Sequence, residues 1–401
     1  MTQFAVKDGE LIVGGVPLSR LAARVGRTPF YAYDRQALTA RVASLRAAFP
    51  RAVKLHYAMK ANPMPALVGH MASLVDGIDV ASAGELKIAL DAGADPHEVS
   101  FAGPGKRDAE LRQAAAAGVL INVEAMREIV VLEDVARELG IAPRVAVRVN
   151  PDFELKGSGM KMGGGPKQFG IDVEQIPELL VEIGRRGLAF EGFHLFGGSQ
   201  NLRAESIRDA QNQAYDLALR LAGHAPAPVR FLNLGGGMGI PYFPGEQALD
   251  ATPIGANLAQ LVERARSDLP QASIVIELGR YLVGEAGVYV TRVIDRKVSR
   301  GQVFLVTDGG LHHHLSASGN FGQVVRKNYP VMIGTRAGDG PRETASVVGP
   351  LCTPLDLLAD RMSLAVAGPG DLVVVFQSGA YGASASPQRF LGHPDCVEVL
   401  V

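Results

Sequence analysis

The chain has few cysteines, no tryptophan and almost no net charge. Cys352 and Cys396 are too few for a disulfide framework and too far apart to form a metal-binding pair. Forty basic residues against 41 acidic ones leave a formal net charge of -1, which argues against a nucleic-acid partner or a polybasic membrane surface. The first residues, MTQFAVKDGE, do not have the pattern expected of a signal peptide, and no apolar run approaches the ~18 residues of a membrane span. We therefore expect a soluble cytoplasmic protein.

What the sequence does contain is enough apolar material for a large core. Of its 401 residues, 47% are hydrophobic and 20% are charged, which excludes a disordered chain. At roughly 150 residues per domain, this length predicts two to three domains. The 47 glycines and 24 prolines follow no collagen-like period and are expected in loops and turns.

From about residue 53 to residue 280, a short apolar strand followed by an amphipathic helix recurs along the chain. Eight such alternations predict a parallel (β/α)8 barrel, because the alternative, a doubly wound open sheet, seldom has eight consecutive units. The strands are expected at residues 53–60, 77–83, 99–103, 119–124, 144–150, 190–199, 231–237 and 273–279. The helices between them include residues 83–93, 107–118, 125–140, 175–186, 204–225 and 255–269.

After Arg280 the pattern changes to β-rich segments separated by glycine and proline turns. These segments are residues 288–298, 302–307, 345–348, 371–377 and 396–401. Near the start, residues 4–6 and 11–13 flank Lys-Asp-Gly-Glu and predict a hairpin. We expect a barrel domain at residues 28–280 and a discontinuous β domain at residues 1–27 and 281–401. Residues 157–165 form a glycine-rich insertion, interpreted as a flexible lid.

The active site of a (β/α)8 barrel lies at the carboxyl ends of its strands, and three of these ends carry suggestive residues. Lys60 could be a desolvated nucleophile toward an aldehyde or simply an exposed lysine at a strand end. The run Gly235, Gly236, Gly237 could cradle a phosphate with its backbone N–H groups or form a tight strand-to-helix turn. Glu277 could hold a ring nitrogen protonated, and Arg280 could bind a phosphate or a carboxylate. Alternatively, the two residues could form an ion pair with each other at the rim of the barrel. Together, an amine, a phosphate cradle and a carboxylate indicate pyridoxal 5'-phosphate (PLP).

The run His312-His313-His314 invites a metal hypothesis. Adjacent histidines point in different directions, and no second ligand pair with fixed spacing accompanies them. We therefore expect no metal site, and we interpret the run as a solvated turn.

Motifs along the whole chain resemble the fold-type III PLP-dependent decarboxylases, the family of diaminopimelate, ornithine and biosynthetic arginine decarboxylases. The matching segments are residues 57–62, 79–85, 148–151, 168–171, 197–200, 235–240, 277–280, 349–352 and 379–382. Nine motifs in family order make the resemblance specific. It implies a TIM-like barrel with a C-terminal β domain of the alanine racemase/ornithine decarboxylase type.

The resemblance also implies roles for individual residues. Lys60 would bind PLP covalently, and Cys352 would protonate the α-carbon from the partner subunit of a homodimer with shared active sites. Glu277 would face the ring nitrogen. The other expected cofactor contacts are Asp79, His194, Phe196, Ser199, Gly235, Gly236, Gly237, Gly279, Arg280 and Tyr381. The expected substrate contacts are Arg280, Cys352, Thr353, Asp356 and Tyr381.

Two departures from the family pattern bear on the ring stacking and on the substrate. Phe196 stands where the family has a histidine that stacks on the cofactor, and His194 lies two residues earlier on the same strand face, so either ring could stack. Family members that act on diamino acids follow the cysteine with an acidic residue, whereas here Thr353 and Pro354 follow it. A distal ammonium would lack its partner, which disfavours free diaminopimelate, lysine and ornithine.

The segment around Cys352 resembles a divergent branch of the family. That branch contains decarboxylases found with exosortase gene clusters and an enzyme that decarboxylates a glutamyl group on an acyl carrier protein. We therefore expect an α-decarboxylase of an L-amino acid or aminoacyl group, with a carrier protein as a possible partner. Arg326, Lys327 and Tyr329 are candidates to bind an anionic or phosphopantetheine-like linker between the carrier and the aminoacyl group. The alternatives are diaminopimelate decarboxylase, a related racemase, and a non-catalytic PLP-binding regulator, which intact Lys60, Glu277 and Cys352 disfavour.

Overall fold

The computed structural model describes residues 3–153, 160–161, 163–321, 323 and 326–401. The chain divides into two compact units. The barrel unit comprises Arg41–Ile240 and Gln247–Tyr281, and the mixed-sheet unit comprises Met1–Ala40, Pro241–Glu246 and Leu282–Val401. The expected lid at residues 157–165 includes residues 157–159 and 162, which lie outside the described residues.

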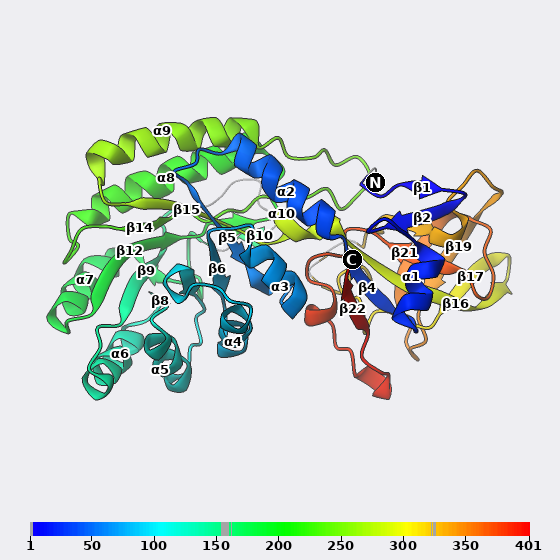
Figure 1. Ribbon diagram of the computed structural model, residues 1–401, viewed down its shortest axis with the longest axis horizontal. Coiled ribbons are helices and arrows are strands. Elements are labelled where there is room, and N and C mark those ends of the chain that lie inside the picture. Colours follow the sequence, from blue (N-terminus) through cyan, green and yellow to red (C-terminus); the bar gives the residue numbers. More distant parts are fainter. Residues whose placement is uncertain (1–2, 154–159, 162, 322, 324–325) are drawn as a thin grey trace. The chain divides into compact units, whose positions relative to one another are not determined.

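Within the described residues, eight parallel strands close into a ring in the barrel unit (Figure 1). Around the ring the strands are β9 (Arg144–Asn150), β12 (Ala189–Leu195), β14 (Phe231–Asn233), β15 (Ser273–Leu278), β5 (Lys54–Ala58), β6 (Gly77–Val80), β7 (Val99–Phe101) and β8 (Leu120–Val123), which pairs with β9 again. Short strands β10 (Met160–Lys161) and β13 (Gly198–Ser199) pair antiparallel, and β11 (Ile171–Asp172) pairs with β9. The predicted (β/α)8 barrel is confirmed.

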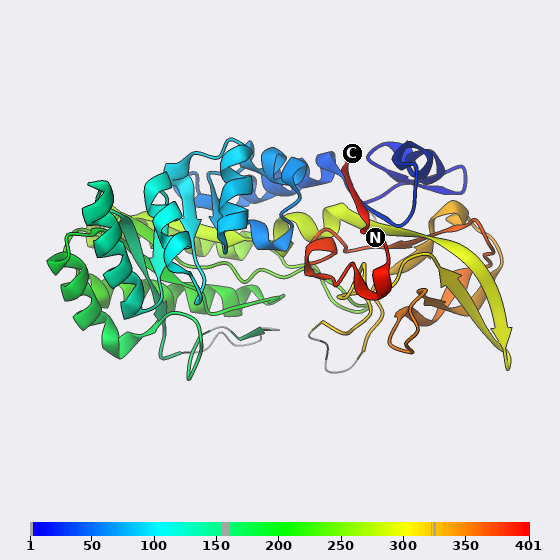
Figure 2. The same cartoon turned by 90° about the horizontal axis from the view of Figure 1, so that it is seen from below.

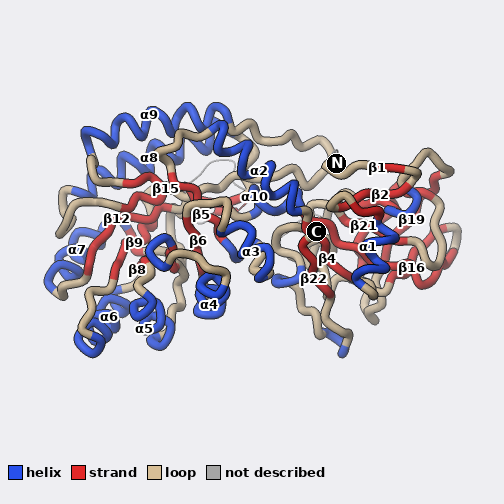
Figure 3. Tube along the Cα trace, viewed as in Figure 1, coloured by secondary structure: helices blue, strands red, loops and turns tan. Residues whose placement is uncertain are grey.

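Helices alternate with the barrel strands, α2 preceding the first of them, and lie on their outer side, as Figures 2 and 3 show. They are α2 (Arg35–Ala48), α3 (Pro65–Ala72), α4 (Ala83–Asp91), α5 (Asp108–Ala117), α6 (Met126–Leu139), α7 (Ile176–Arg185), α8 (Ala204–Ala222) and α9 (Thr252–Asp268). Local signals set their ends: Ser82 caps α4 by accepting the N–H of Glu85, and Gly118 and Gly140 end α5 and α6 in the left-handed conformation. Within the described ranges, every helix is too short or too polar to span a bilayer.

The mixed-sheet unit is built on a twisted sheet whose central strand, β16, is long. The strands run in the order β18 (Val331–Ile333), β21 (Leu372–Val375), β16 (Gly287–Ser299), β17 (Gln302–Thr307), β19 (Arg342–Val348) and β20 (Leu357–Ala365). Strand β4 (Phe30–Tyr33) pairs with β16 and with β22 (Val397–Leu400). It therefore belongs to this sheet, although it follows residue 28, where the barrel domain was expected to begin.

The first residues form a small sheet of their own rather than joining the large one. It consists of β1 (Val6–Lys7), β2 (Glu10–Val13) and β3 (Val16–Pro17), and helix α1 (Leu18–Val25) follows. Leu11 and Val13 of β2 share a hydrophobic core with Phe30 of β4 and Val374 of β21. The expected hairpin is thus present, and side-chain packing, not strand pairing, attaches it to the large sheet.

Candidate active site

The carboxyl end of β5 carries Lys60. The residue lies in a single 3-10 turn, Met59–Ala61, directly after the strand. The hydroxyl of Tyr57 donates to the carbonyl of Asn62 at 2.7 Å, which ties the turn back to the strand. The Lys60 side chain is exposed, and its Nζ lies 5.6 Å from the ring centroid of Phe196, which follows β12. The turn therefore presents a primary amine over an aromatic face at the barrel mouth.

Glu277, near the end of β15, has a buried carboxylate. Its Oε2 accepts a hydrogen bond from Nδ2 of Asn233 at 3.0 Å and lies 3.1 Å from Nε2 of His194. Burial alone would raise the pKa of Glu277, but neighbouring His194, with the positive charges of Lys60 and Arg148, lowers it below its usual value. Glu277 is therefore a carboxylate that can accept a proton donor, such as a protonated ring nitrogen.

The glycine run after β14 is held against two other strand ends. Gly235 has φ +74°, and a Cβ there would lie 2.7 Å from the carbonyl oxygen of Leu195. A Cβ on Gly236 would overlap the carbonyl oxygen of Glu277. Both positions therefore require glycine, and at this part of the barrel mouth the surface is formed by backbone atoms rather than side chains. The alternative of a tight strand-to-helix turn is wrong, because α9 begins only at Thr252.

A buried charge network, which the sequence did not reveal, supports the ends of β7, β8 and β9. Arg148 donates to Glu124 at 3.0 Å, and Lys106 pairs with Glu128 at 3.0 Å. Burial raises the pKa of Glu124, but Arg148 and Lys106 outweigh it and lower the pKa overall. Glu124 also accepts the N–H groups of Gly103 and Gly170 at 2.6 and 3.0 Å. Arg148 and Glu124 lie at the ends of two strands that the sequence predicts, but only the closed barrel brings their side chains together.

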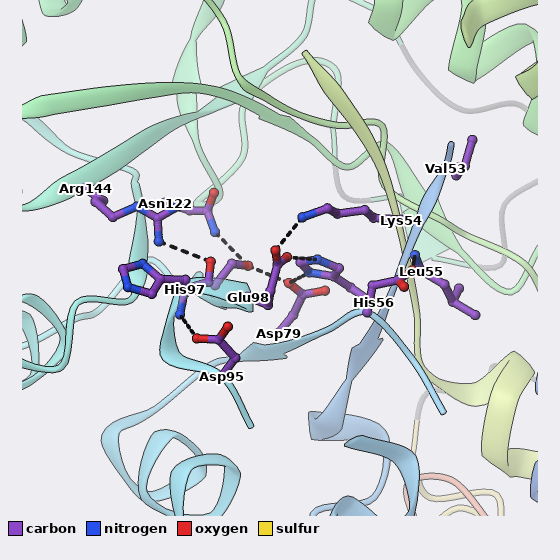
Figure 4. A network of polar contacts seen from close by, with 12 residues as sticks. Val53, Lys54, Leu55, His56, Asp79, Asp95, His97, Glu98, Asn122 and Arg144 are labelled. Atoms are coloured by element: carbon purple, nitrogen blue, oxygen red, sulfur yellow. Dashed lines mark hydrogen bonds and ion pairs between the residues drawn. The ribbon is translucent and has the colours of Figure 1, made fainter. Parts of the chain in front are cut away.

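Asp79 contacts residues of the barrel interior (Figure 4). Its Oδ1 lies 3.1 Å from Nδ1 of His56 and accepts the hydroxyl hydrogen of Ser100. Asn122 donates to the same hydroxyl at 3.3 Å. A cavity of about 130 Å³ adjoins His56 and Ser100 on the amino-terminal side of the strands. These contacts hold the Asp79 carboxylate from the amino-terminal side of the barrel. Its expected contact with a cofactor stays a prediction.

The other expected cofactor residues of the barrel unit lie close to the turn of Lys60 or to the glycine run. Gly279 packs on that turn, since a Cβ there would lie 3.0 Å from Cβ of Ala61. Half-buried Arg280 begins the short helix α10 (Arg280–Val283). Ser199 ends β13, and the following residue, Gln200, hydrogen-bonds to the backbone of Ile240 beyond the glycines.

Cys352 lies in the mixed-sheet unit, exposed in the loop between β19 and β20. The Thr353 hydroxyl accepts the N–H of Leu355 at 3.3 Å and is part of the turn. Asp356 is buried, and its two oxygens accept the N–H groups of Leu311 and Leu351 at 2.6 and 2.8 Å. Burial raises the pKa of Asp356 in spite of these bonds. Asp356 therefore braces the loop that presents the thiol, a role that sequence reasoning missed.

Tyr381, also in the mixed-sheet unit, has a strained backbone. Its φ is +52°, which is uncommon outside glycine, and its carbonyl accepts the Ser316 hydroxyl at 2.8 Å. A Cβ on the nearby Gly379 would overlap the carbonyl oxygen of Val283. The Gly-Ala-Tyr-Gly motif thus encodes a turn that tight packing holds in an unusual conformation.

The interpretation of the histidine run as a solvated turn is wrong, because His312, His313 and His314 are all buried. His313 hydrogen-bonds through Nε2 to the carbonyl of Pro394 at 2.9 Å, and the ring of His312 lies between those of His313 and His393. Burial and these two neighbouring histidines lower the pKa of His312 to about 3. The three rings are packed as uncharged core residues.

Two of the three candidates for gripping a linker have structural partners. Arg326 donates to the carbonyls of Ser318 and Leu357 at 3.1 and 2.8 Å. Tyr329 is buried and packs on Tyr242, with ring centroids 4.9 Å apart. Lys327 is exposed, and its Nζ lies 5.1 Å from the ring of Phe243.

The residues at the barrel mouth fit PLP. Lys60 offers an amine for an aldehyde, Glu277 offers a carboxylate for a ring nitrogen, and Gly235 and Gly236 offer a backbone surface without side chains, where a Cβ would collide with the neighbouring strand ends.

Comparisons with known proteins agree with this chemistry. The family model described as "Pyridoxal-dependent decarboxylase, pyridoxal binding domain" matches residues 35–284. The chain is 40% identical over 381 residues to L-glutamyl-[BtrI acyl-carrier protein] decarboxylase of Niallia circulans, covering 93% of this chain and 88% of that protein. It is 33% identical over 398 residues to diaminopimelate decarboxylase of Aquifex aeolicus, covering 98% and 91%. The crystal structure of diaminopimelate decarboxylase from Helicobacter pylori complexed with L-lysine aligns with a TM-score of 0.83 and 27% identity, covering 96% and 94%.

Proposed function

The chain belongs to the family of pyridoxal-dependent decarboxylases, and we propose that its substrate is an L-glutamyl group carried by an acyl carrier protein. The chain is a PLP-dependent carboxy-lyase; the proposal concerns what it decarboxylates. The observation that carries it is the loop of Cys352. Thr353 is uncharged and engaged in its own turn, and both oxygens of Asp356 accept backbone N–H groups. From residue 349 to 356, this loop offers no carboxylate for a distal ammonium.

The relative with 40% identity supports the same substrate, since its name specifies a glutamyl group on a carrier protein. A glutamyl group joined to its carrier through the side chain has no distal charge, so the loop needs no acidic residue. A free diamino acid would bring a second ammonium, and a cation placed in a site without its partner is costly.

The residues of the chain divide the catalytic work among them. When bound, PLP supplies an electron sink for the electron pair that remains on the α-carbon after loss of carbon dioxide. Lys60 holds the cofactor aldehyde, Glu277 keeps a proton at the ring nitrogen, and the backbone of Gly235 to Gly237 with Arg280 holds the phosphate. The thiol of Cys352 then gives a proton to the α-carbon, acting as the general acid.

We further propose a homodimer in which Cys352 of each subunit serves the barrel of the other. Cys352 is exposed on its loop, as a residue that acts outside its own unit must be. Mixing Lys60→Ala with Cys352→Ala subunits should restore part of the activity, because one of the two mixed sites would have both residues intact. No recovery in verified mixed dimers would contradict the shared site.

The substrate proposal is tested by measuring kcat/KM for carbon dioxide release from a carrier-bound L-glutamyl thioester, free L-glutamate, diaminopimelate, lysine and ornithine. We expect the carrier-bound substrate to be preferred. Hydrogen bonds to charged groups contribute roughly 1.5–3 kcal/mol, so Thr353→Asp should improve diaminopimelate turnover by about tenfold or more. Thr344→Asp, at an exposed position of β19, adds the same charge elsewhere and should not. Wild-type preference for diaminopimelate would refute the proposal and favour diaminopimelate decarboxylase.

A further inference from the structure

Asn233 occupies a position that touches both the acid and the glycine run of the barrel mouth. It ends β14, between β12 and β15 in the ring, and is completely buried. Its Nδ2 donates to Oε2 of Glu277 at 3.0 Å. Its Oδ1 accepts the N–H of Gly235 at 2.8 Å.

The chemistry of the two neighbours allows only this orientation of the amide. An ionised carboxylate only accepts hydrogen bonds, so the NH₂ group must face Glu277; a backbone N–H only donates, so the oxygen must face Gly235. A buried polar group left without its partner is costly, so each bond holds the other in place. One side chain thereby couples the position of the acid to that of the glycine backbone.

The geometry around Oε2 indicates what this coupling achieves. Among the residues that the structure describes, the side-chain contacts of Glu277 come from Asn233 and from His194, and both fall on Oε2. A carboxylate whose Oε2 is fixed on one side presents Oε1 in a fixed direction. The hydrogen bond from Asn233 also stabilises the ionised form of Glu277 that a protonated ring nitrogen requires.

We propose that Asn233 is a positioning residue that aims Glu277 at the ring nitrogen of PLP and fixes the backbone of Gly235, where the glycine run begins, relative to it. The inference rests on the proposed role of Glu277 as the partner of that nitrogen. In this proposal Asn233 contacts neither the substrate nor the cofactor, and it acts only through Glu277 and Gly235.

The test compares the binding of PLP with that of 1-deazapyridoxal 5'-phosphate, in which carbon replaces the ring nitrogen, to full-length apoprotein by equilibrium dialysis. Losing the bond to Gly235 weakens both ligands, whereas misplacing Glu277 weakens PLP alone. Since a hydrogen bond to a charged group corresponds to about tenfold or more in affinity, Asn233→Ala should reduce the preference for PLP over the analogue about tenfold. An unchanged preference would overturn the proposal.

Two further variants separate the possible causes of failure. Glu277→Gln should itself reduce the preference for PLP. If it does not, the proposed role of Glu277 is wrong. If Glu277→Gln reduces the preference and Asn233→Ala does not, only the inference about Asn233 is refuted. Asn257→Ala is the matched control, because Asn257 is a buried asparagine of the same unit that donates to Gln211 at 3.2 Å, away from the mouth. It should leave the preference unchanged.

Asn233→Asp keeps the volume and the acceptor for Gly235, so it answers the question if the alanine variant does not fold. It places a second carboxylate about 3 Å from Oε2, and two carboxylates so close raise the pKa of the pair. The pH profile of PLP binding should then gain an ionisation that wild type lacks. A profile identical to that of wild type would contradict the proposal.

Discussion

Replacing His314 by glutamine should remove part of the acid sensitivity of the fold. His314 is completely buried. Its Nδ1 accepts the N–H of Ala317 at 3.3 Å, so Nε2 carries the hydrogen and donates to the hydroxyl of Ser378 at 2.9 Å. The neutral ring uses both nitrogens, and protonation of Nδ1 would break the bond to Ala317. Burial lowers the pKa of His314 to about 3.

The size of the effect follows from the difference between folded and unfolded states. In the unfolded chain a histidine has a pKa of about 6.5, so between that pH and about pH 3 the unfolded state binds a proton that the folded state does not. The free energy of unfolding therefore falls as the pH falls, by about 1.4 kcal/mol per pH unit below 6.5. From pH 7 to pH 5 this amounts to about 2 kcal/mol for His314. His312, whose pKa is lowered to about 3 as well, acts in the same direction.

The assay is urea unfolding of the holoenzyme at pH 5, 6 and 7, followed by far-UV circular dichroism. His314→Gln should be less stable than wild type at pH 7, because packing is lost. The difference should shrink by about 2 kcal/mol at pH 5, since glutamine does not titrate. The exposed His224, replaced in the same way, is the control for a histidine outside the core. A difference that stays constant from pH 7 to pH 5 would refute the reasoning.

Three further variants test the barrel mouth. Gly236→Ala should lower Tm and weaken PLP binding in calorimetry, because its Cβ would overlap the backbone of Glu277, whereas Gly69→Ala, with open space around the new Cβ, should do neither. Arg148→Leu should lower the free energy of unfolding by about 3–5 kcal/mol, because it leaves buried Glu124 without the guanidinium group of Arg148. Replacing both residues by leucine should lower it less. Equal decreases in the single and the double variant would argue against the ion pair. Lys60→Ala should lose the visible absorbance of covalently held PLP, while Lys54→Ala should keep it; absorbance retained in Lys60→Ala would identify another lysine.

The barrel could be predicted because each of its strands is followed by a helix with its own boundary signals. The mixed sheet was harder to predict. Strand β20 has exposed and charged residues in its middle, including Asp360 and Arg361, and shows no clean alternation. Strands β4 and β18 span only Phe30–Tyr33 and Val331–Ile333, and their pairing with β16 and β21 joins segments that are distant in sequence. Such pairings leave no local pattern in the sequence.

The same distinction separates the site residues that could be predicted from those that could not. Lys60, Glu277 and the glycine run stand out because strand ends meet at one mouth in any parallel barrel. Asn233 did not stand out, since a buried asparagine is informative only once its two partners are known. The bracing role of Asp356 depends in the same way on Leu311, 45 positions away. The chemistry of a side chain can be read locally, but its partners follow from ring closure and packing.

The two rings that the sequence left as alternatives for stacking have different neighbours in the structure. His194 lies against Glu277 and helps to keep it ionised, so its imidazole has an electrostatic task. Phe196 lies beneath Nζ of Lys60 and beside Gly235, between the amine and the cradle. A cofactor joined to Lys60 and held by the glycines must pass that position, so we expect Phe196 to provide the aromatic face.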